Sequence, residues 1–360
     1  MNNNIKSFAI VSLNTEASYF KDLNLTVLND PLYKSFANKF KKLDLIIVGL
    51  QEDKKKSKSL EFFQAIFTNH YFIKEEFLSG FGKEGFRGLR LFIFYKNTKN
   101  EKLINIKIVK KCDHSSCFIG KCCNKGCTAL KINNLVIINS HLAFKGSKID
   151  QSFDDRVCMI NNLYNKIKTP LKLNIDHNNE NVIWFGDLNF RVLSIFNNNK
   201  NNEENLNNEE NLNNEENLNN EENLNILSNM TGISIEDLKT QKTQKALLSK
   251  NFNKSFKKYF EKEQLISLEN GKDKQLKTKC KLPFNIYEAP IKFKPTCKLI
   301  KGSSSEYQIF NKGHIRIPSW CDRIIFNKNV RDNYNIKYNS IKFPIPTDHI
   351  GVYGIFTKKD

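Results

Sequence analysis

Short apolar runs rich in Val, Ile and Phe recur along the chain and are separated by polar stretches. Runs of about four to eight such residues are typical of strands that are buried in a sheet. The predicted strands are residues 8–14, 45–51, 89–95, 104–109, 135–140, 182–186 and 323–326. Strands are therefore expected from near the beginning of the chain to near its end.

Other segments predict helices between these strands. Leu60, Phe63 and Phe67 recur at helical spacing and share one face, with Ser59 as a candidate N-cap. The predicted helices are residues 59–68, 154–167 and 246–268. Because strands and helices are mixed over the whole length, we expect one layered α/β domain over residues 1–360.

One low-complexity segment interrupts this pattern. Residues 197–225 repeat Asn-Asn-Glu-Glu-Asn-Leu with a period of six, which fits neither a helix nor a strand. One residue in six is apolar, so the segment cannot bury enough surface to offset the entropy of ordering. We expect a disordered surface insertion within the single domain.

The composition agrees with a large buried core and adds a strong positive charge. The chain is 39% hydrophobic, contains 28 Phe and has a net charge of +19. The rest of the chain is more basic still, because residues 201–225 contain eight Glu and no Lys or Arg. This charge favours nucleic acid, phosphoinositide headgroups or an anionic membrane face. A Lys-rich composition explains it equally well, so charge selects the partner only weakly.

The sequence contains no segment expected to cross a membrane. No run approaches the roughly 20 apolar residues that a bilayer requires, and residues 1–6 lack the apolar core of a signal peptide. Nine cysteines are an odd number and are unevenly spread, which argues against a disulfide framework. We expect a cytoplasmic protein that associates peripherally with membranes.

Polar side chains end five of the short segments, at positions where a core strand would not need them. These ends are Ser12-Leu13-Asn14, Gly49-Leu50-Gln51-Glu52, Asn139-Ser140-His141, Gly186-Asp187-Leu188-Asn189 and Thr347-Asp348-His349. Each has an ordinary explanation by itself, such as a charged loop after Glu52. Together they offer a Glu and an Asn for a hard cation such as Mg²⁺. They also offer imidazoles and carboxylates for proton transfer and charge stabilisation.

The order of these residues resembles the endonuclease/exonuclease/phosphatase superfamily. Two segments are similar to the signature motifs of inositol polyphosphate 5-phosphatases, namely Trp184-Phe185-Gly186-Asp187-Leu188-Asn189-Phe190-Arg191 and Pro318-Ser319-Trp320-Cys321-Asp322-Arg323-Ile324. Residues 124–126, 139–143 and 293–298 also fit that family. The resemblance implies a two-layered β-sandwich flanked by helices, and a hydrolase that removes the 5-phosphate of phosphoinositides or soluble inositol polyphosphates.

The resemblance also assigns catalytic roles. Glu52, helped by Asn14, would hold Mg²⁺ against the scissile phosphate. Asp187 would act as the base toward the attacking water, and Asn189 would position that water or a phosphate oxygen.

Two imidazoles complete this set. His349 would stabilise the charge that builds on the phosphoryl group, with His141 on another oxygen. Either Asp348 or Asp322 would orient His349, and the sequence leaves that choice open.

Four cations are assigned to the remaining substrate phosphates by the same resemblance. Lys298 and Arg316 would contact the 4-phosphate, and Lys125 would lie beside the inositol pocket. Arg323 is grouped with them, although it is better suited to brace the site than to touch substrate.

The chain departs from the family pattern at three places, and these leave 4-phosphate selectivity open. Cys297 stands where the family usually has Tyr, and His314 stands where a Lys is common. The usual Arg-Asn-x-Asp segment appears here only as Arg156-Val157-Cys158-Met159.

Other functions fit parts of this pattern. A nuclease or a sphingomyelinase-type phosphodiesterase of the same superfamily would share the catalytic residues but not Lys298 and the Trp320–Arg323 block. A non-catalytic phosphoinositide-binding module would be expected to lack Asp187, Asn189 or His349, and all three are present. We expect no nucleic-acid partner, and a monomer.

Two further segments carry weaker signals. Five thiols in Cys112-x4-Cys117-x4-Cys122-Cys123-x3-Cys127, with His114, are either reduced loop cysteines or a zinc site. Phe77, Phe81 and Phe86 lie among glycines, in either a lipid-facing loop or a strand turn.

Overall fold

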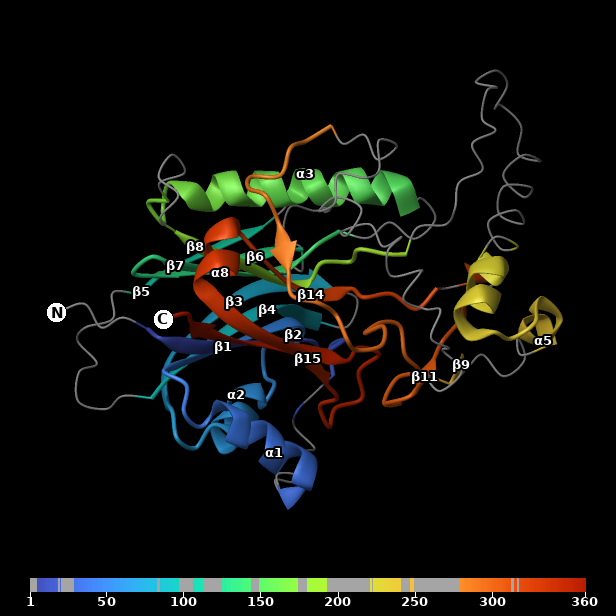
Figure 1. The fold of residues 1–360 in the computed structure, drawn as a ribbon, viewed down its shortest axis with the longest axis horizontal. Coiled ribbons are helices and arrows are strands. Elements are labelled where there is room, and N and C mark those ends of the chain that lie inside the picture. Colours follow the sequence, from blue (N-terminus) through green and yellow to red (C-terminus); the bar gives the residue numbers. More distant parts are fainter. Residues whose placement is uncertain are drawn as a thin grey trace.

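Two six-stranded mixed sheets pack face to face in the computed structural model (Figure 1). The structure describes residues 5–18, 20, 29–82, 85–96, 106–112, 125–143, 149–173, 180–192, 221, 223–240, 247–248, 279–311, 314–315 and 317–360. The predicted β-sandwich flanked by helices is confirmed.

Each sheet combines strands from distant parts of the chain. The first has the order β15 (Tyr334–Ile341), β16 (Gly351–Lys358), β1 (Ser7–Asn14), β2 (Leu45–Lys54), β4 (Gly85–Tyr95) and β3 (Tyr71–Gly82). The second has the order β10 (Tyr287–Glu288), β14 (Asp322–Phe326), β8 (Asn181–Asp187), β7 (Leu135–His141), β6 (Gly126–Ile132) and β5 (Ile106–Cys112). Two short antiparallel pairs join β9 (Leu247–Leu248) to β11 (Glu306–Tyr307) and β12 (Phe310–Asn311) to β13 (His314–Ile315).

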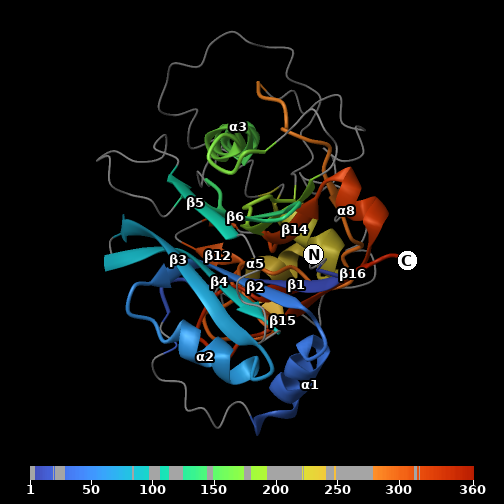
Figure 2. The ribbon, with the colours of Figure 1, turned by 90° about the vertical axis from the view of Figure 1, so that its left-hand side faces the viewer.

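Successive side chains of each central strand point to opposite faces of the sheet, and the hydrophobic core is therefore divided into three layers. Phe8 and Ile10 of β1 lie between the sheets, while Ala9 and Val11 face the other way. Helices cover both outer faces, as Figures 1 and 2 show: α1 (Pro31–Phe40) and α2 (Ser59–Ile66) on the first sheet, and α3 (Ile149–Lys168) on the second. Because the central strands are buried on both faces, their sequences are continuous apolar runs.

The seven predicted strands are all present, but several other elements were not predicted. The missed elements are α1, α5 (Ile235–Thr240), α8 (Lys328–Asn333) and strands β3, β6, β15 and β16, together with the short strands β9 to β13. The edge strand β15 shows the reason, because its side chains alternate between exposed and partly buried positions. Such a strand contains no apolar run.

Two of the three predicted helices are confirmed. Residues 59–68 and 154–167 correspond to α2 and α3. Ser59 is not the N-cap of α2, which is Lys58; the Ser59 hydroxyl instead donates to Asp53 over 3.0 Å.

The predicted helix over residues 246–268 is wrong at its beginning. Leu247 and Leu248 form strand β9, and the rest of that segment, from residue 249, lies outside the described residues.

The Asn/Glu-rich insertion ends earlier than predicted. Residues 223–231 are helical, and Leu224, Ile226 and Leu227 are buried in the same hydrophobic cluster as the residues between the sheets. The spacing of these apolar residues, closer than in the repeats before them, allows a helix to bury one face. Residues 197–220 lie outside the described part of the chain.

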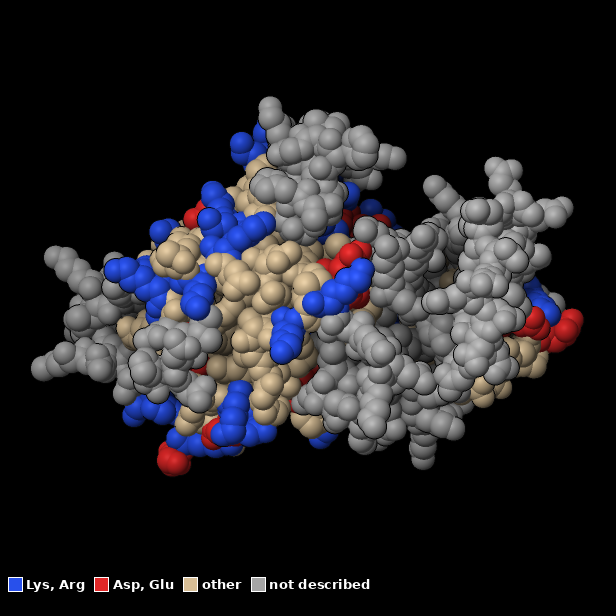
Figure 3. All heavy atoms as spheres, turned by 90° about the horizontal axis from the view of Figure 1, so that it is seen from above, with Lys and Arg blue, Asp and Glu red and all other residues tan. Residues whose placement is uncertain are grey.

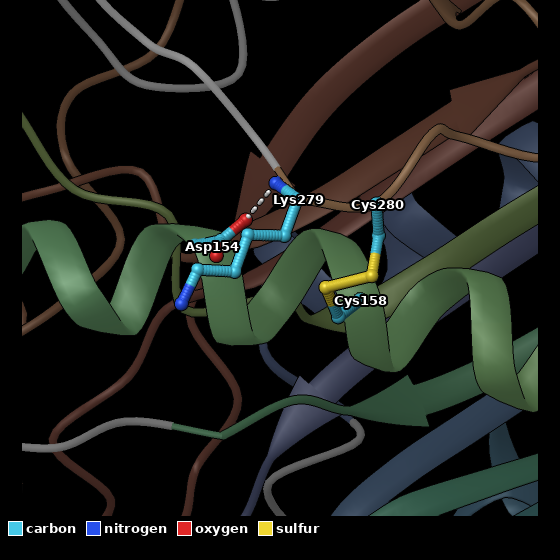
Figure 4. Close-up of a disulfide and its surroundings, with 4 residues drawn as sticks. All are labelled: Asp154, Cys158, Lys279 and Cys280. Atoms are coloured by element: carbon cyan, nitrogen blue, oxygen red, sulfur yellow. Dashed lines mark hydrogen bonds between the residues drawn. A yellow bond between two sulfur atoms is a disulfide. The ribbon is translucent and has the colours of Figure 1, made fainter.

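A disulfide, which the cysteine count argued against, joins Cys158 of α3 to Cys280 (Figure 4). Beside it, the Lys279 backbone donates to the Asp154 carboxylate over 2.8 Å. Cys112 is also disulfide-bonded and is therefore not a thiolate ligand for zinc. Cys117, Cys122, Cys123 and His114 lie outside the described residues.

The segment around Phe77 is a strand and not a loop. β3 and β4 form a hairpin, and the Arg90 guanidinium lies 4.4 Å from the centroid of the Phe77 ring. The side chains of residues 80–86, including Phe81 and Phe86, lie outside the described part of the structure. Of the helices that the structure describes, none has the length and apolar character required to cross a bilayer.

Gly186→Ala is expected to destabilise the fold by about 4 kcal/mol or more. Gly186 has φ +131°, and a Cβ there would lie 1.9 Å from the Ser140 carbonyl oxygen across the β7–β8 pair. Gly302→Ala is the matched control, because its φ is +84° but its nearest atoms are 3.9 Å away. We expect Gly302→Ala to cost about 1 kcal/mol in denaturant unfolding. Equal losses in the two variants would contradict the steric explanation.

Candidate active site

The polar strand ends predicted from the sequence meet at one edge of the sandwich. β7 and β8 run parallel with His141 opposite Asp187, and β14 pairs on the other side of β8 with Asp322 opposite Asp187. Asn14 reaches the same point from the first sheet, since its amide donates to Asp187 over 2.8 Å. One rung of the second sheet therefore aligns three of the predicted residues.

Asp187 is the hub of this cluster and is 2% exposed. Its Oδ2 accepts from the Asn14 amide and lies 3.2 Å from Nε2 of His141, while its Oδ1 accepts from the Asn189 backbone over 3.1 Å. Burial works to raise the pKa of Asp187, but the hydrogen bond from His141 and the charges of His349 and Lys125 hold it well below its usual range. The carboxylate is therefore ionised at neutral pH.

Asn189 is held in place from two sides. Its φ is +55°, a left-handed conformation in which Asn is favoured over most residues. The side-chain amide donates to the Leu142 carbonyl over 3.0 Å, and its oxygen accepts from Arg191 over 2.9 Å. These bonds fix the amide next to Asp187.

His349 pairs with Asp322, which decides the alternative that the sequence left open. Nδ1 of His349 lies 2.8 Å from Asp322 Oδ2, whereas Nε2 is 3.5 Å from Asp348 Oδ1. Burial works to lower the pKa of His349, but the Asp322 carboxylate raises it well above its usual value. Burial raises the pKa of Asp322 to about 6. At neutral pH the proton resides on the imidazole.

His141 lies in the opposite electrostatic environment. Burial and the charge of Lys125 lower the pKa of His141, although the Asp187 carboxylate works to raise it. The Lys125 ammonium contacts Nε2 of this ring, and burial lowers the pKa of Lys125 to about 8. His141 is therefore a neutral imidazole at neutral pH, on the other side of Asp187 from Asp322.

Glu52 provides a partly open carboxylate at the end of β2. Its Oε1 lies 3.8 Å from His141, and its Oε2 pairs with Arg87 at 2.6 Å. Asn14 lies nearby, with its oxygen accepting from the Glu16 backbone over 2.9 Å. Among the described residues no group of three or more His, Cys, Asp or Glu side chains forms a metal site. One carboxylate beside an amide fits Mg²⁺, which keeps several water ligands and binds substrate phosphates directly.

The four predicted phosphate-binding cations do not all lie at the active site. Lys298 is partly exposed and forms an ion pair with Asp348, and Lys125 lies at the active site. The assignment of Arg323 to substrate is wrong, because this side chain is fully buried and paired with Glu288. Side chains alternate along a strand, so Arg323 points away from the face that carries Asp322. Arg316, and the side chain of His314, lie outside the described residues.

Three site residues received no role from the sequence. Arg191 bridges Asn189 to Cys297, and Arg87 pairs with Glu52. Thr347 links the two catalytic elements, since its hydroxyl donates to the Asn14 carbonyl over 2.7 Å and accepts from the His349 backbone over 3.2 Å. Arg191 and Thr347 adjoin motif residues, but Arg87 has no comparable signal in the sequence.

The chain is similar in sequence to known proteins. The family model described as Endonuclease/Exonuclease/phosphatase family 2 matches residues 11–259 and 233–355. The chain is 25% identical over 323 residues to Type IV inositol polyphosphate 5-phosphatase 11 of Arabidopsis thaliana, covering 86% of this chain and 73% of that protein. It is 24% identical to Phosphatidylinositol 4,5-bisphosphate 5-phosphatase INP51 of Saccharomyces cerevisiae, covering 75% of this chain and 22% of that protein.

Solved structures share the fold at lower sequence similarity. A Cimex nitrophorin, solved as a ferrous NO complex, superposes with a TM-score of 0.53 at 16% identity, covering 98% of each chain. A point mutant of the same nitrophorin gives a TM-score of 0.52 over the same share. At this level of identity the similarity concerns the sandwich alone.

The pKa values of the two active-site imidazoles are expected to be shifted in opposite directions. His349 should remain protonated above its ordinary pKa of about 6.5, while His141 should remain neutral to below that value. Histidine NMR titrations, assigned with His141→Gln and His349→Gln, measure both pKa values directly.

Asp322→Asn tests the cause of the His349 shift. Removal of the paired carboxylate should lower the His349 pKa toward its ordinary value and leave His141 nearly unchanged. A wild-type His349 that titrates at or below 6.5 would show that the Asp322 pair does not control it.

Proposed function

The chain belongs to the endonuclease/exonuclease/phosphatase family, and on that premise we propose that it removes the 5-phosphate from phosphoinositides, soluble inositol polyphosphates, or both. The observation that carries this proposal is the buried Asp187 carboxylate, with His141 3.2 Å away on one side and the His349–Asp322 pair on the other. Two relatives named as 5-phosphatases support the substrate class. The reaction class is phosphoric monoester hydrolysis, and neither relative is named as a nuclease or a sphingomyelinase.

The attacking water is oriented by Asp187. Because this carboxylate is ionised at neutral pH, its oxygens accept a hydrogen bond from the water and take up its proton as attack proceeds. The amide of Asn189, fixed by Leu142 and Arg191, positions the same water or a phosphate oxygen.

The charge that builds on the phosphoryl oxygens is stabilised by the two imidazoles. His349 is cationic and held by Asp322, so it presents positive charge without reorganisation during the reaction. His141, neutral and buried, lies on the other side of Asp187. Lys125 and Lys298 contribute further positive charge for the ring phosphates.

Mg²⁺ is the proposed cofactor, with Glu52 and Asn14 as the protein groups that hold it. When bound, a divalent cation polarises the phosphoryl oxygens and neutralises their charge. Release of Glu52 from its pair with Arg87 would make both carboxylate oxygens available.

We also propose that residues 1–360 form one catalytic domain that acts as a monomer, with the Asn/Glu-rich repeats as a surface insertion.

An anionic membrane surface is a second partner. Figure 3 supports a general electrostatic attraction, because Lys and Arg are spread over the described part of the α3 side, with fewer Asp and Glu. The Cys158–Cys280 disulfide is unusual for the cytoplasmic setting that we predicted.

Asp187→Asn should reduce phosphate release from PtdIns(4,5)P2, PtdIns(3,4,5)P3 and Ins(1,4,5)P3 by about 10³-fold or more, with little loss of binding. The Asn keeps the size of the side chain but removes the charge and the base. Asp332→Asn is the matched control, because Asp332 is exposed on α8 and should leave the rate unchanged.

The same assay tests the metal and the position that is cleaved. Chelation of divalent cations should abolish phosphate release, and Mg²⁺ should restore it. PtdIns4P has no 5-phosphate, so it should release none. Phosphate release from PtdIns4P, or full activity of Asp187→Asn, would overturn the proposed function.

A further inference from the structure

Two free thiols, Cys297 and Cys321, lie together beside the catalytic imidazole. The Cys297 and Ser319 backbones pair in an isolated bridge, with N–H to O distances of 3.1 and 2.6 Å in the two directions. Cys321 follows Ser319 by two residues and therefore lies diagonally across this bridge from Cys297. The Cys321 thiol donates to the Phe190 carbonyl over 3.6 Å, and it also interacts electrostatically with the sulfur of Cys297.

Positive groups surround the sulfur of Cys297. Arg191 donates to it over 3.8 Å, and Cys297 also bridges His349, whose charged imidazole contacts the same sulfur. The interaction with Cys321 lowers the pKa of Cys297 well below its usual value, and His349 and Arg191 add to this although burial opposes it. The thiolate is the nucleophilic form of cysteine, so this environment makes Cys297 reactive.

The other free thiol of the described residues provides an internal contrast. Cys127 is completely buried in β6, and burial raises its pKa to about 12. Cys297 is also nearly buried, at 2% exposure, but the neighbouring Arg191 and Lys298 side chains are partly exposed. Among these three cysteines, only Cys297 combines a second thiol, an adjacent guanidinium and partly exposed neighbouring side chains.

We propose that Cys297 and Cys321 form an oxidation-sensitive thiol pair, which a peroxide converts into a disulfide that reversibly inactivates the site. The inactivation, as distinct from the disulfide itself, rests on the proposed phosphatase function.

The chemistry balances with a peroxide as the only co-reactant. The Cys297 thiolate attacks hydrogen peroxide, an S–O bond forms, and the O–O bond breaks with loss of hydroxide. The Cys321 sulfur then attacks the Cys297 sulfenic acid, so that an S–S bond forms and the second oxygen leaves as water with the Cys321 proton. The two sulfurs lose two electrons in total, and the peroxide is reduced to one water and one hydroxide, which becomes a second water by taking up the proton that the Cys297 thiol released on ionisation.

The disulfide would disturb the site through Arg191 and through the backbone. Arg191 loses a thiolate partner, and this guanidinium also holds the oxygen of Asn189. Residues 297 and 321 also adjoin Thr296, Lys298 and Asp322, and the Thr296 hydroxyl accepts from the Asp322 backbone over 3.2 Å. Drawing the two sulfurs together therefore shifts the groups on which His349 and the phosphate contacts depend.

The test treats the full-length reduced protein with hydrogen peroxide and follows two readouts. Peptide mapping by mass spectrometry should detect a Cys297–Cys321 disulfide, with Cys158–Cys280 as an internal reference. Phosphate release should fall by about tenfold or more in parallel, and a thiol reductant should restore it. Because mapping does not need an activity, a failure of the proposed function leaves the disulfide testable.

Variants separate this pair from other thiols. Cys297→Ala should lose activity to peroxide at least about tenfold more slowly than the wild type, relative to its own initial rate. Cys127→Ala should remain as sensitive as the wild type.

Cys321→Ala supplies a second route if Cys297→Ala does not fold. Without the second thiol, peroxide should carry Cys297 to the sulfinic acid, and the reductant should no longer restore activity. Peroxide inactivation of the wild type without a Cys297–Cys321 disulfide would overturn the proposal, as would equal sensitivity of Cys297→Ala and the wild type.

Discussion

The buried carboxylate of Asp187 is the constraint on which the rest of the site depends. An ionised group at 2% exposure is costly unless charge and hydrogen bonds compensate it. The compensating groups come from both sheets, with Asn14 from the first and His141 and the Asn189 backbone from the second. The two sheets must therefore pack in one relative position, and the site forms only when the whole sandwich has folded.

The same constraint gives the two imidazoles different charges within one small site. His349 is cationic because the buried Asp322 carboxylate is 2.8 Å from its ring, whereas His141 stays neutral because burial and the charge of Lys125 lower its pKa. A catalytic centre for phosphate needs positive charge near the developing anion, and the paired Asp322 keeps that charge in a fixed position. The Cys297 sulfur lies within this positive region, against His349 and Arg191.

Much of the fold was predictable because the central strands are buried on both faces. All seven predicted strands exist, and six of them are buried along nearly their whole length, where a strand must be apolar; β5, at the edge of the second sheet, is only partly buried. The exposed edge strand β15 and the short α1 were not predicted, because one face of each contacts water and leaves no continuous apolar run. The repeat region shows the same limit, since burial of Leu224 depends on a core made by distant strands.

The sequence by itself determined the family, the layered fold and the residue types of the catalytic set, because strand ends in this fold carry chemistry and their order is visible along the chain. Tertiary structure decided which groups pair. It placed Asp322 rather than Asp348 on Nδ1 of His349, buried Arg323 against Glu288, and joined Cys158 to Cys280. It also brought Cys321 against Cys297 at the base of the site. Charge and pKa depend on distances between residues that lie far apart in sequence, and only the packed sandwich defines those distances.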